Sequence, residues 1–181
     1  MQEQELNDNW ILFYDQNSPY YAFSNFYVHD KPLIIDGLAY KTVEHYYQSK
    51  KFPNDPEYTE LIRNASTPGS AKVLGLQKTS FDYDWAKKLM ALVKKYNATM
   101  RQDWELVKVD VMTKALKEKF TQDPYCKELL LSTGSKYLVE NAGPRDCFWG
   151  NSVKNLKDPN KIGQLGILLM ALRNELKTEK I

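Results

Sequence analysis

The sequence has few of the residues that bind metals or form covalent cross-links. Two cysteines, Cys126 and Cys147, and two histidines, His29 and His45, occur in 181 residues. Two cysteines are too few for a disulfide framework, so we expect a reducing compartment, the cytoplasm. Because no set of Cys and His stands at metal-ligand spacing, the sequence also predicts no metal site. The pattern G-x-S-x-G is absent, which argues against a serine hydrolase.

Long apolar runs and a surplus of one charge are missing as well. No run approaches the roughly 20 apolar residues that span a bilayer, and the beginning, MQEQELNDNW, lacks the segments of a signal peptide. Lys and Arg number 25 against 23 Asp and Glu, so the formal charge is only +2. That balance argues against a dedicated surface for duplex nucleic acid, but it allows a local cationic pocket for phosphate. We expect no contact with membranes.

The composition is typical of a globular protein, and strand patterns at the beginning of the sequence give way to helical patterns. Hydrophobic residues make up 43% and charged residues 27% of the chain, which favours one domain with a real core. The runs WILFYD and FYVHDKPLIIDGLAY are rich in β-branched and aromatic residues and are interrupted by Asp-Lys-Pro and Asp-Gly. They predict short strands joined by turns, and Pro32 favours an edge strand or irregular pairing.

Helical patterns dominate from Thr42 onward. Thr42 is a candidate N-cap for a helix that ends near Phe52, because Pro53 follows. The clearest helical pattern runs from about 103 to 120. Further helices are expected near 57–65, 69–76, 83–97, 124–132 and 162–177, and a strand at 136–140 is expected to return to the N-terminal sheet. The predicted fold is α+β, a predominantly helical single domain over residues 1–181 with a small N-terminal antiparallel sheet.

The segment YKTVEHYYQSKKF, residues 40–52, concentrates titratable groups and aromatic rings at the start of a helix. Glu44 and Lys51 are seven positions apart, so on a helix they share a face about 10.5 Å apart along the axis, with Gln48 between them. This spacing is too long for an ion pair but suits two groups that bracket a small ligand. The alternative is that helix-end preferences explain both charges, since acids favour the N-terminus and bases the C-terminus.

Two other segments carry polar groups among aromatic rings. Ser24 and Asn25 lie within YYAFSNFY, where the loop could bond a base edge while the rings stack on it; the alternative is a polar turn between buried rings. In DCFWG, Asp146 beside Trp149 could act as a general acid or base; the alternative is a turn aspartate before a core tryptophan. Residues 151–166 precede the last helix, whose N-terminus could bind an anion with help from Lys154, Lys157 or Lys161. The alternative is that this segment is a surface loop.

Taken in order, these motifs resemble the NADAR family, also called YbiA-like. The matching motifs are FSNFY, IDGLAYKTVEHYYQSKKF, RQDW, LLLSTGSKYLVE, DCFWG and LGILLMALR, within a core from about Asn9 to Leu176. The resemblance implies an N-glycosidase with one compact, helix-rich domain and no cofactor. It also implies one of two substrate classes: ADP-ribosylated guanine in nucleic acid or nucleotides, or phosphorylated ribosylamino-pyrimidine intermediates of riboflavin synthesis. A transient contact with nucleic acid is compatible with the first class.

The resemblance also implies which residues act. Glu44 would assist proton transfer or steady an oxocarbenium-like cation, and Asp146 would orient the ribose hydroxyls or water. Lys51 has two candidate roles: a point charge for a phosphate, or a nucleophile that attacks C1′ and forms a Schiff base with the opened sugar. The predicted substrate-binding residues are Phe23, Ser24, Asn25, Gln48, Arg101, Trp104, Trp149 and Gly150.

One departure from the family pattern stands before the last helix. The family shows G-x-N-x-L-G there, whereas this chain has Gly163-Gln164-Leu165-Gly166 with Asn160 upstream. The departure concerns the substrate contacts of that loop and leaves the Glu44 segment unchanged. Two rival functions stay open: a catalytically silent ADP-ribose or nucleotide sensor, and a purely structural helical domain.

Overall fold

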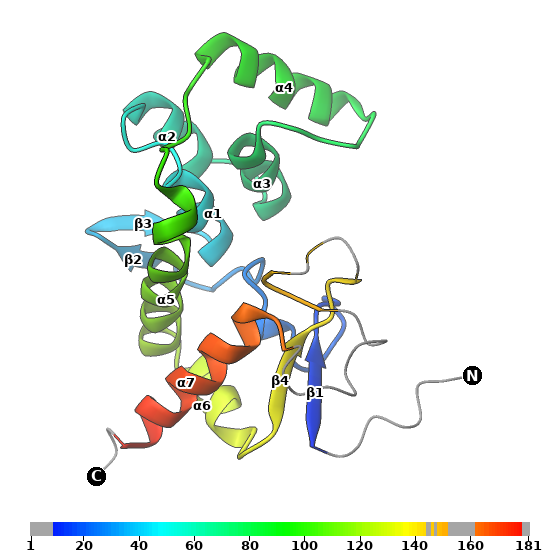
Figure 1. The fold of residues 1–181 in the computed structure, drawn as a ribbon, viewed down its shortest axis with the longest axis vertical. Helices are drawn as coiled ribbons and strands as arrows, with labels where there is room; N and C mark the ends of the chain where they lie inside the picture. Colours follow the sequence, from blue (N-terminus) through cyan, green and yellow to red (C-terminus); the bar gives the residue numbers. More distant parts are fainter. Residues whose placement is uncertain (1–8, 144–145, 147, 152–161, 179–181) are drawn as a thin grey trace. The chain divides into compact units, whose positions relative to one another are not determined.

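The computed structural model describes residues 9–143, 146, 148–151 and 162–178 (Figure 1). They belong to two compact units: unit 1 comprises Met1–Ser24 and Asp123–Ile181, and unit 2 comprises Asn25–Gln122. Long helices and short strands make up both units, so the predicted α+β, predominantly helical class is confirmed. In the described part of the chain, no helix has both the length and the apolar character needed to cross a membrane.

Unit 1 is built on a parallel pair of strands. β1 (Trp10–Phe13) pairs with β4 (Tyr137–Glu140), with Trp10 opposite Tyr137, so the predicted return of this segment to the N-terminal strand is confirmed. Alternate residues of β1 are buried, as expected for a strand with one face on a core. The other elements described in unit 1 are η1 (Tyr21–Phe23), α6 (Pro124–Ser132) and α7 (Gln164–Thr178). α7 packs against β4 and α6, and α6 packs against η1.

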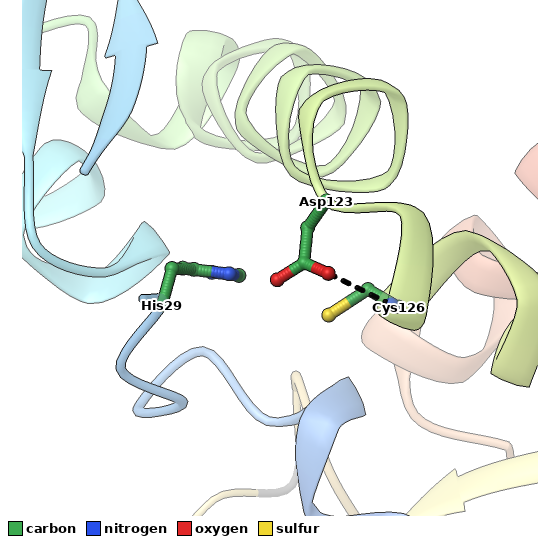
Figure 2. A group of neighbouring side chains, drawn as sticks. All are labelled: His29, Asp123 and Cys126. Atoms are coloured by element: carbon green, nitrogen blue, oxygen red, sulfur yellow. Dashed lines mark hydrogen bonds between the residues drawn. The ribbon is translucent and has the colours of Figure 1, made fainter. Parts of the chain in front are cut away.

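The ends of α6 are fixed by side chains that bond the backbone. Asp123 is the N-cap and accepts a hydrogen bond of 3.0 Å from the backbone N–H of Cys126 (Figure 2). Beyond the other end, the buried Arg173 of α7 donates from Nη1 to Thr133 Oγ1 and to the carbonyl of Lys136, both at 2.8 Å. Arg173 thereby holds the turn between α6 and β4 against α7.

Unit 2 begins with the predicted antiparallel pairing. β2 (Leu33–Ile35) and β3 (Leu38–Tyr40) form a hairpin, and Pro32 stands just before β2. The turn residues Asp36 and Gly37 have φ of 54° and 76°, the left-handed conformation that makes Asp-Gly a preferred hairpin turn. The helices of unit 2 are α1 (Val43–Ser49), α2 (Pro56–Arg63), α3 (Pro68–Leu76), α4 (Asp84–Tyr96) and α5 (Trp104–Gln122).

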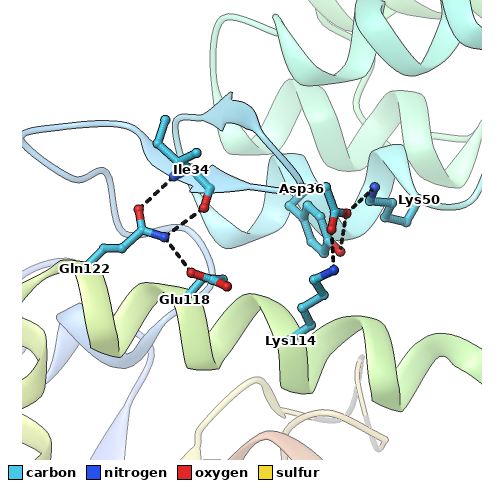
Figure 3. Close-up of polar contacts among 7 residues, drawn as sticks. Ile34, Asp36, Lys50, Lys114, Glu118 and Gln122 are labelled. Atoms are coloured by element: carbon cyan, nitrogen blue, oxygen red, sulfur yellow. Dashed lines mark hydrogen bonds and ion pairs between the residues drawn. The ribbon is translucent and has the colours of Figure 1, made fainter.

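Side chains of α5 hold the hairpin at two points (Figure 3). The amide of Gln122 bonds both backbone groups of Ile34, donating to the carbonyl and accepting from the N–H at 2.8 Å each. This amide satisfies an edge of β2 as a further strand would. At the turn, Asp36 pairs with Lys114 of α5 and with Lys50, which lies 2.7 Å away just after α1. The hairpin, α1 and α5 are therefore fixed to one another.

α1 lies at the centre of unit 2, in contact with α2, α3, α5 and β3. The helix was predicted to end near Phe52, but it ends at Ser49. After Ser49 the hydrogen bonds join residues three apart. The N–H of Lys51 donates to the carbonyl of Gln48, and the N–H of Phe52 donates to the carbonyl of Ser49. The reason is that the ring of Phe52 must enter the core formed with α2, α3 and α4. The residues of that core are Phe52, Tyr58, Ile62, Ala65, Ala71, Leu74 and Ala98.

Candidate active site

α1 buries polar and charged groups along its whole length. All seven of its residues are buried. Glu44 exposes 5% of its surface, Gln48 2%, and Lys51 beyond the helix end 5%. Removing such groups from water is unfavourable unless they are paired, and clusters of them concentrate at functional sites. A solvated helix face, the simplest form of the helix-end interpretation, does not account for this burial.

His45 has a structural place in this helix. Its backbone N–H donates to the N-cap hydroxyl of Thr42 at 3.3 Å, while Nδ1 lies 2.8 Å from that hydroxyl and Nε2 lies 3.1 Å from the carbonyl of Ala65. A carbonyl only accepts, so Nε2 carries the proton and Nδ1 accepts from Thr42. Burial lowers the pKa of His45, which keeps the ring neutral. Both ring nitrogens are thus used inside the fold.

Glu44 and Gln48 are bonded to each other on the face of α1. Gln48 Nε2 donates to Glu44 Oε1 at 2.8 Å, and the backbone N–H of Glu44 donates to the carbonyl of Asn25 at 3.0 Å. Within the described residues, Gln48 Oε1 and Asn25 Oδ1 are buried acceptors without a hydrogen-bond partner. Buried acceptors of this kind are rare in proteins, and both belong to residues bonded to Glu44. They suit a ligand that brings N–H or O–H donors.

The amine of Lys51 lies among aromatic rings and one carbonyl. Nζ is 5.4 Å from the ring centre of Trp104, 5.6 Å from that of Tyr47 and 3.5 Å from the carbonyl oxygen of Gly75. Burial lowers the pKa of Lys51 to about 8, although the charge of Glu44 opposes this change. At neutral pH about a tenth of the amine is therefore uncharged, far more than for an exposed lysine.

Three residues near Lys51 had no recognisable signal in the sequence. A Cβ on Gly75 would lie 2.1 Å from Gln48 Oε1, so only glycine lets α3 approach α1 this closely. Lys72 and Lys78 are exposed, and their charges further lower the pKa of Lys51. Nζ of Lys72 also lies 5.6 Å from the ring centre of Phe26. Finding these residues requires the packing of α3 on α1, which no local pattern reveals.

Two predicted binding residues at the start of α5 meet Lys51. The backbone N–H of Arg101 donates to the carbonyl of Lys51 at 2.8 Å, while its guanidinium pairs with Asp103 at 2.6 and 2.8 Å. Trp104 is buried and packs edge-on against Tyr47, with ring centres 4.9 Å apart. Unit 2 therefore unites several of the predicted site residues in one neighbourhood. They are Asn25, Glu44, Gln48, Lys51, Arg101 and Trp104.

Asp146 bonds the backbone of two residues that follow it in unit 1, Phe148 and Trp149. Asp146 Oδ1 accepts from the backbone N–H groups of Phe148 at 3.2 Å and Trp149 at 2.9 Å. These bonds are those of a turn aspartate, one of the two interpretations of this segment. A Cβ on Gly150 would lie 2.7 Å from Ala142 Cβ, so the glycine is required by close packing. A catalytic role for Asp146, and substrate contacts of Trp149 and Gly150, stay predictions.

The predicted residues of the FSN loop are buried. Phe23 is fully buried and packs edge-on against Phe13, with ring centres 5.7 Å apart, so its ring is a core group of unit 1. Ser24 is buried as well, and its N–H closes η1 on the carbonyl of Tyr21. Their contact with substrate stays a prediction. The candidate anion-binding lysines Lys154, Lys157 and Lys161 lie outside the described residues, as do Cys147 and Asn160.

Comparison with known proteins agrees with the motifs. The NADAR domain matches residues 12–177. N-glycosidase YbiA of Shigella flexneri serotype 5b (strain 8401) is 37% identical over 175 residues, which cover 97% of this chain and 93% of the relative. The chloroplastic riboflavin biosynthesis protein PYRR of Zea mays is 35% identical over 176 residues, 93% of this chain and 25% of the maize protein.

The fold agrees too. The NMR structure of the E. coli protein YbiA matches with a TM-score of 0.71 and 35% identity, covering 99% of this chain and 92% of that chain. An identity above a third along nearly the whole length, together with a shared fold, confirms the resemblance predicted from the motifs. The chain belongs to the NADAR domain family.

Proposed function

We propose that this protein is an N-glycosidase that hydrolyses the C1′–N bond of a ribosylated heterocycle. The enzyme class is supported by membership of the NADAR family and by the name of the Shigella relative, N-glycosidase YbiA. The observation that carries the chemistry is the buried row of Glu44, Gln48 and Lys51 on and just beyond α1.

Cleavage of a C1′–N bond makes two demands on a site. The bonding electron pair leaves with the nitrogen, which must gain a proton, and positive charge develops at C1′ until water adds there. Glu44 is a buried carboxylate that can steady the cation or assist proton transfer, and the bond from Gln48 fixes its orientation. Asp146 would orient the ribose hydroxyls or the water.

Lys51 has two candidate roles in this reaction. In the first, the neutral amine attacks C1′, the heterocycle leaves, and the opened sugar forms a Schiff base that water hydrolyses. The lowered pKa, about 8, favours this role because it supplies neutral amine at neutral pH. In the second, protonated Lys51 holds a phosphate together with Lys72 and Lys78, whose charges act on the same amine.

Borohydride separates the two roles of Lys51. The nucleophilic role predicts a covalent sugar adduct in wild-type protein, found by mass spectrometry on Lys51 and lost in Lys51→Ala. Turnover without any adduct would assign Lys51 to phosphate binding. Glu175→Gln, an exposed change on α7, serves as the folded control.

Two substrates test the activity itself. Purified protein is incubated with an ADP-ribosylated guanosine and with a ribosylamino-pyrimidine phosphate, and sugar release is followed by chromatography. The name of the maize relative, a riboflavin biosynthesis protein, supports the second substrate class. We expect turnover of at least one, loss of turnover in Glu44→Gln, and no change when a chelator is added, because the proposed chemistry uses no metal. Folded protein that binds ADP-ribose and turns over neither substrate would be a sensor instead.

A further inference from the structure

Three aromatic rings lie exposed at the beginning of α4. Phe81, Tyr83 and Trp85, here called the aromatic patch, expose 51%, 62% and 42% of their surfaces. Phe81 and Tyr83 are nearly parallel, 25° apart with ring centres at 6.0 Å, and Trp85 lies 5.8 Å from Phe81. Three large rings within five residues, each in contact with another and with solvent, form a surface that water solvates poorly.

The packing of α4 does not explain these rings. The apolar face of the helix that covers the core of unit 2 consists of Leu89, Leu92, Val93 and Tyr96. The aromatic patch precedes that face along the chain and takes no part in the buried cluster. Exposed rings that lie outside the buried core are candidates for contact with another molecule.

Positive charge accompanies the aromatic patch. Residues 78–95 hold five lysines against two aspartates, a larger surplus of positive charge than that of the whole chain. All five lysines are exposed, and of these five only Lys87 forms an ion pair with a described residue, at 2.9 Å from Asp82. The lysines are Lys78, Lys87, Lys88, Lys94 and Lys95. Exposed rings beside exposed lysines match bases and phosphates that alternate along a single strand.

We propose that the aromatic patch and its lysines bind single-stranded nucleic acid, with unpaired bases stacked on the rings and phosphates near the lysines. A duplex offers no free base faces, so it cannot use the rings. A membrane surface fits less well, because the residues between and before the rings, from Lys78 to Asp84, are all polar or charged and add no apolar area that would enter the lipid. Single-stranded DNA or RNA is therefore the occupant that matches both the rings and the charge.

Fluorescence anisotropy tests the binding. A labelled oligothymidylate and a labelled oligouridylate of about 12 nucleotides are titrated with the full chain at about 50 mM salt. We expect binding of both strands and quenching of tryptophan fluorescence, much of it lost in Trp85→Phe. The triple change Phe81→Ala, Tyr83→Ala and Trp85→Ala should weaken binding about ten-fold or more. Tyr125→Ala, which removes a ring 56% exposed on α6, should leave binding unchanged.

A lysine variant and two other binding partners, a duplex and lipid vesicles, complete the test. Lys88→Ala should weaken binding to both strands alike and make its salt dependence shallower. The proposal is overturned by equal binding of the triple variant and wild type, by equal binding of duplex and single strand, or by binding to phosphatidylserine vesicles only. The triple variant should turn over a mononucleotide-sized substrate as wild type does. If wild type turns over no substrate but binds oligonucleotides through the rings, the enzymatic proposal fails and the binding site stands.

Discussion

Gln48 donates a hydrogen bond of 2.8 Å to Glu44 one helical turn earlier, and both side chains are buried. The other end of the same amide, Oε1, faces Gly75 of α3. Gln48 therefore bonds the candidate acid of α1 through Nε2, while its Oε1 packs against Gly75 of α3 without a hydrogen bond to any described residue. A bond between neighbours on one helix face usually contributes little, but burial makes this one a strong determinant of where the carboxylate points.

Replacing Gln48 by Ala should lower kcat more than it raises KM. The change removes the donor that orients Glu44, and we expect kcat to fall about ten-fold or more. Loss of the bond should also reduce the free energy of unfolding by about 1–2 kcal/mol. Steady-state kinetics and urea unfolding measure the two effects, with Gln102→Ala, an exposed amide, as control. Unchanged kcat in a destabilised variant would assign Gln48 a structural role only.

Gly75→Ala should damage both stability and activity. A helix interior normally gains from this change, but here the new Cβ would lie 2.1 Å from Gln48 Oε1. α3 must move away from α1 or Gln48 must leave Glu44, so we expect a loss of about 1–3 kcal/mol in unfolding free energy.

Gly69→Ala is the matched control for Gly75 on the same helix. Its Cβ would meet Thr67 Oγ1 at 3.8 Å, an ordinary contact. This variant should keep wild-type activity and the same melting temperature to within a few degrees. Equal behaviour of the two variants would contradict the close approach of α3 to α1.

Asp36→Asn should destabilise the protein at neutral pH but not in strong acid. Hydrogen bonds from Lys114 and Lys50 lower the pKa of Asp36 to about 2. The native state thus favours the ionised form, and its contribution is present above about pH 4 and lost as the pH falls toward 2. The group is partly exposed, so we expect only about 0.5–1 kcal/mol. Urea unfolding of both proteins from pH 7 to pH 2 should show the difference vanish.

Local signals predicted most of the fold. Thr42 is an N-cap that bonds the backbone as expected, and Asp36-Gly37 forms the expected tight turn. The end of α1 was missed because Phe52 leaves the helix to reach a core formed by residues far along the chain. Helix propensity describes neighbours within one turn and carries no information about that core.

The candidate site was predicted in its α1 part and missed in its α3 part. Glu44 and Lys51 stood out because charged groups rarely share a helix start with aromatic rings, and the structure buries both. Gly75 and Lys72 meet this site only through the packing of two helices. For Asp146, the sequence left a turn role and a catalytic role open, and its bonds to Phe148 and Trp149 are those of a turn.

The pH dependence of single-turnover cleavage should reveal the form of Lys51 that acts. Its pKa is lowered to about 8 by burial, so the amine is mostly protonated at pH 7 and mostly neutral at pH 9. If the neutral amine attacks C1′, the rate should rise about ten-fold per pH unit below 8 and level off above it. If the protonated amine holds a phosphate, affinity should instead fall above pH 8. Lys51→Arg, which stays charged throughout, should lose activity in the first case and retain much of it in the second. A rate independent of pH from 6 to 9 would exclude both roles.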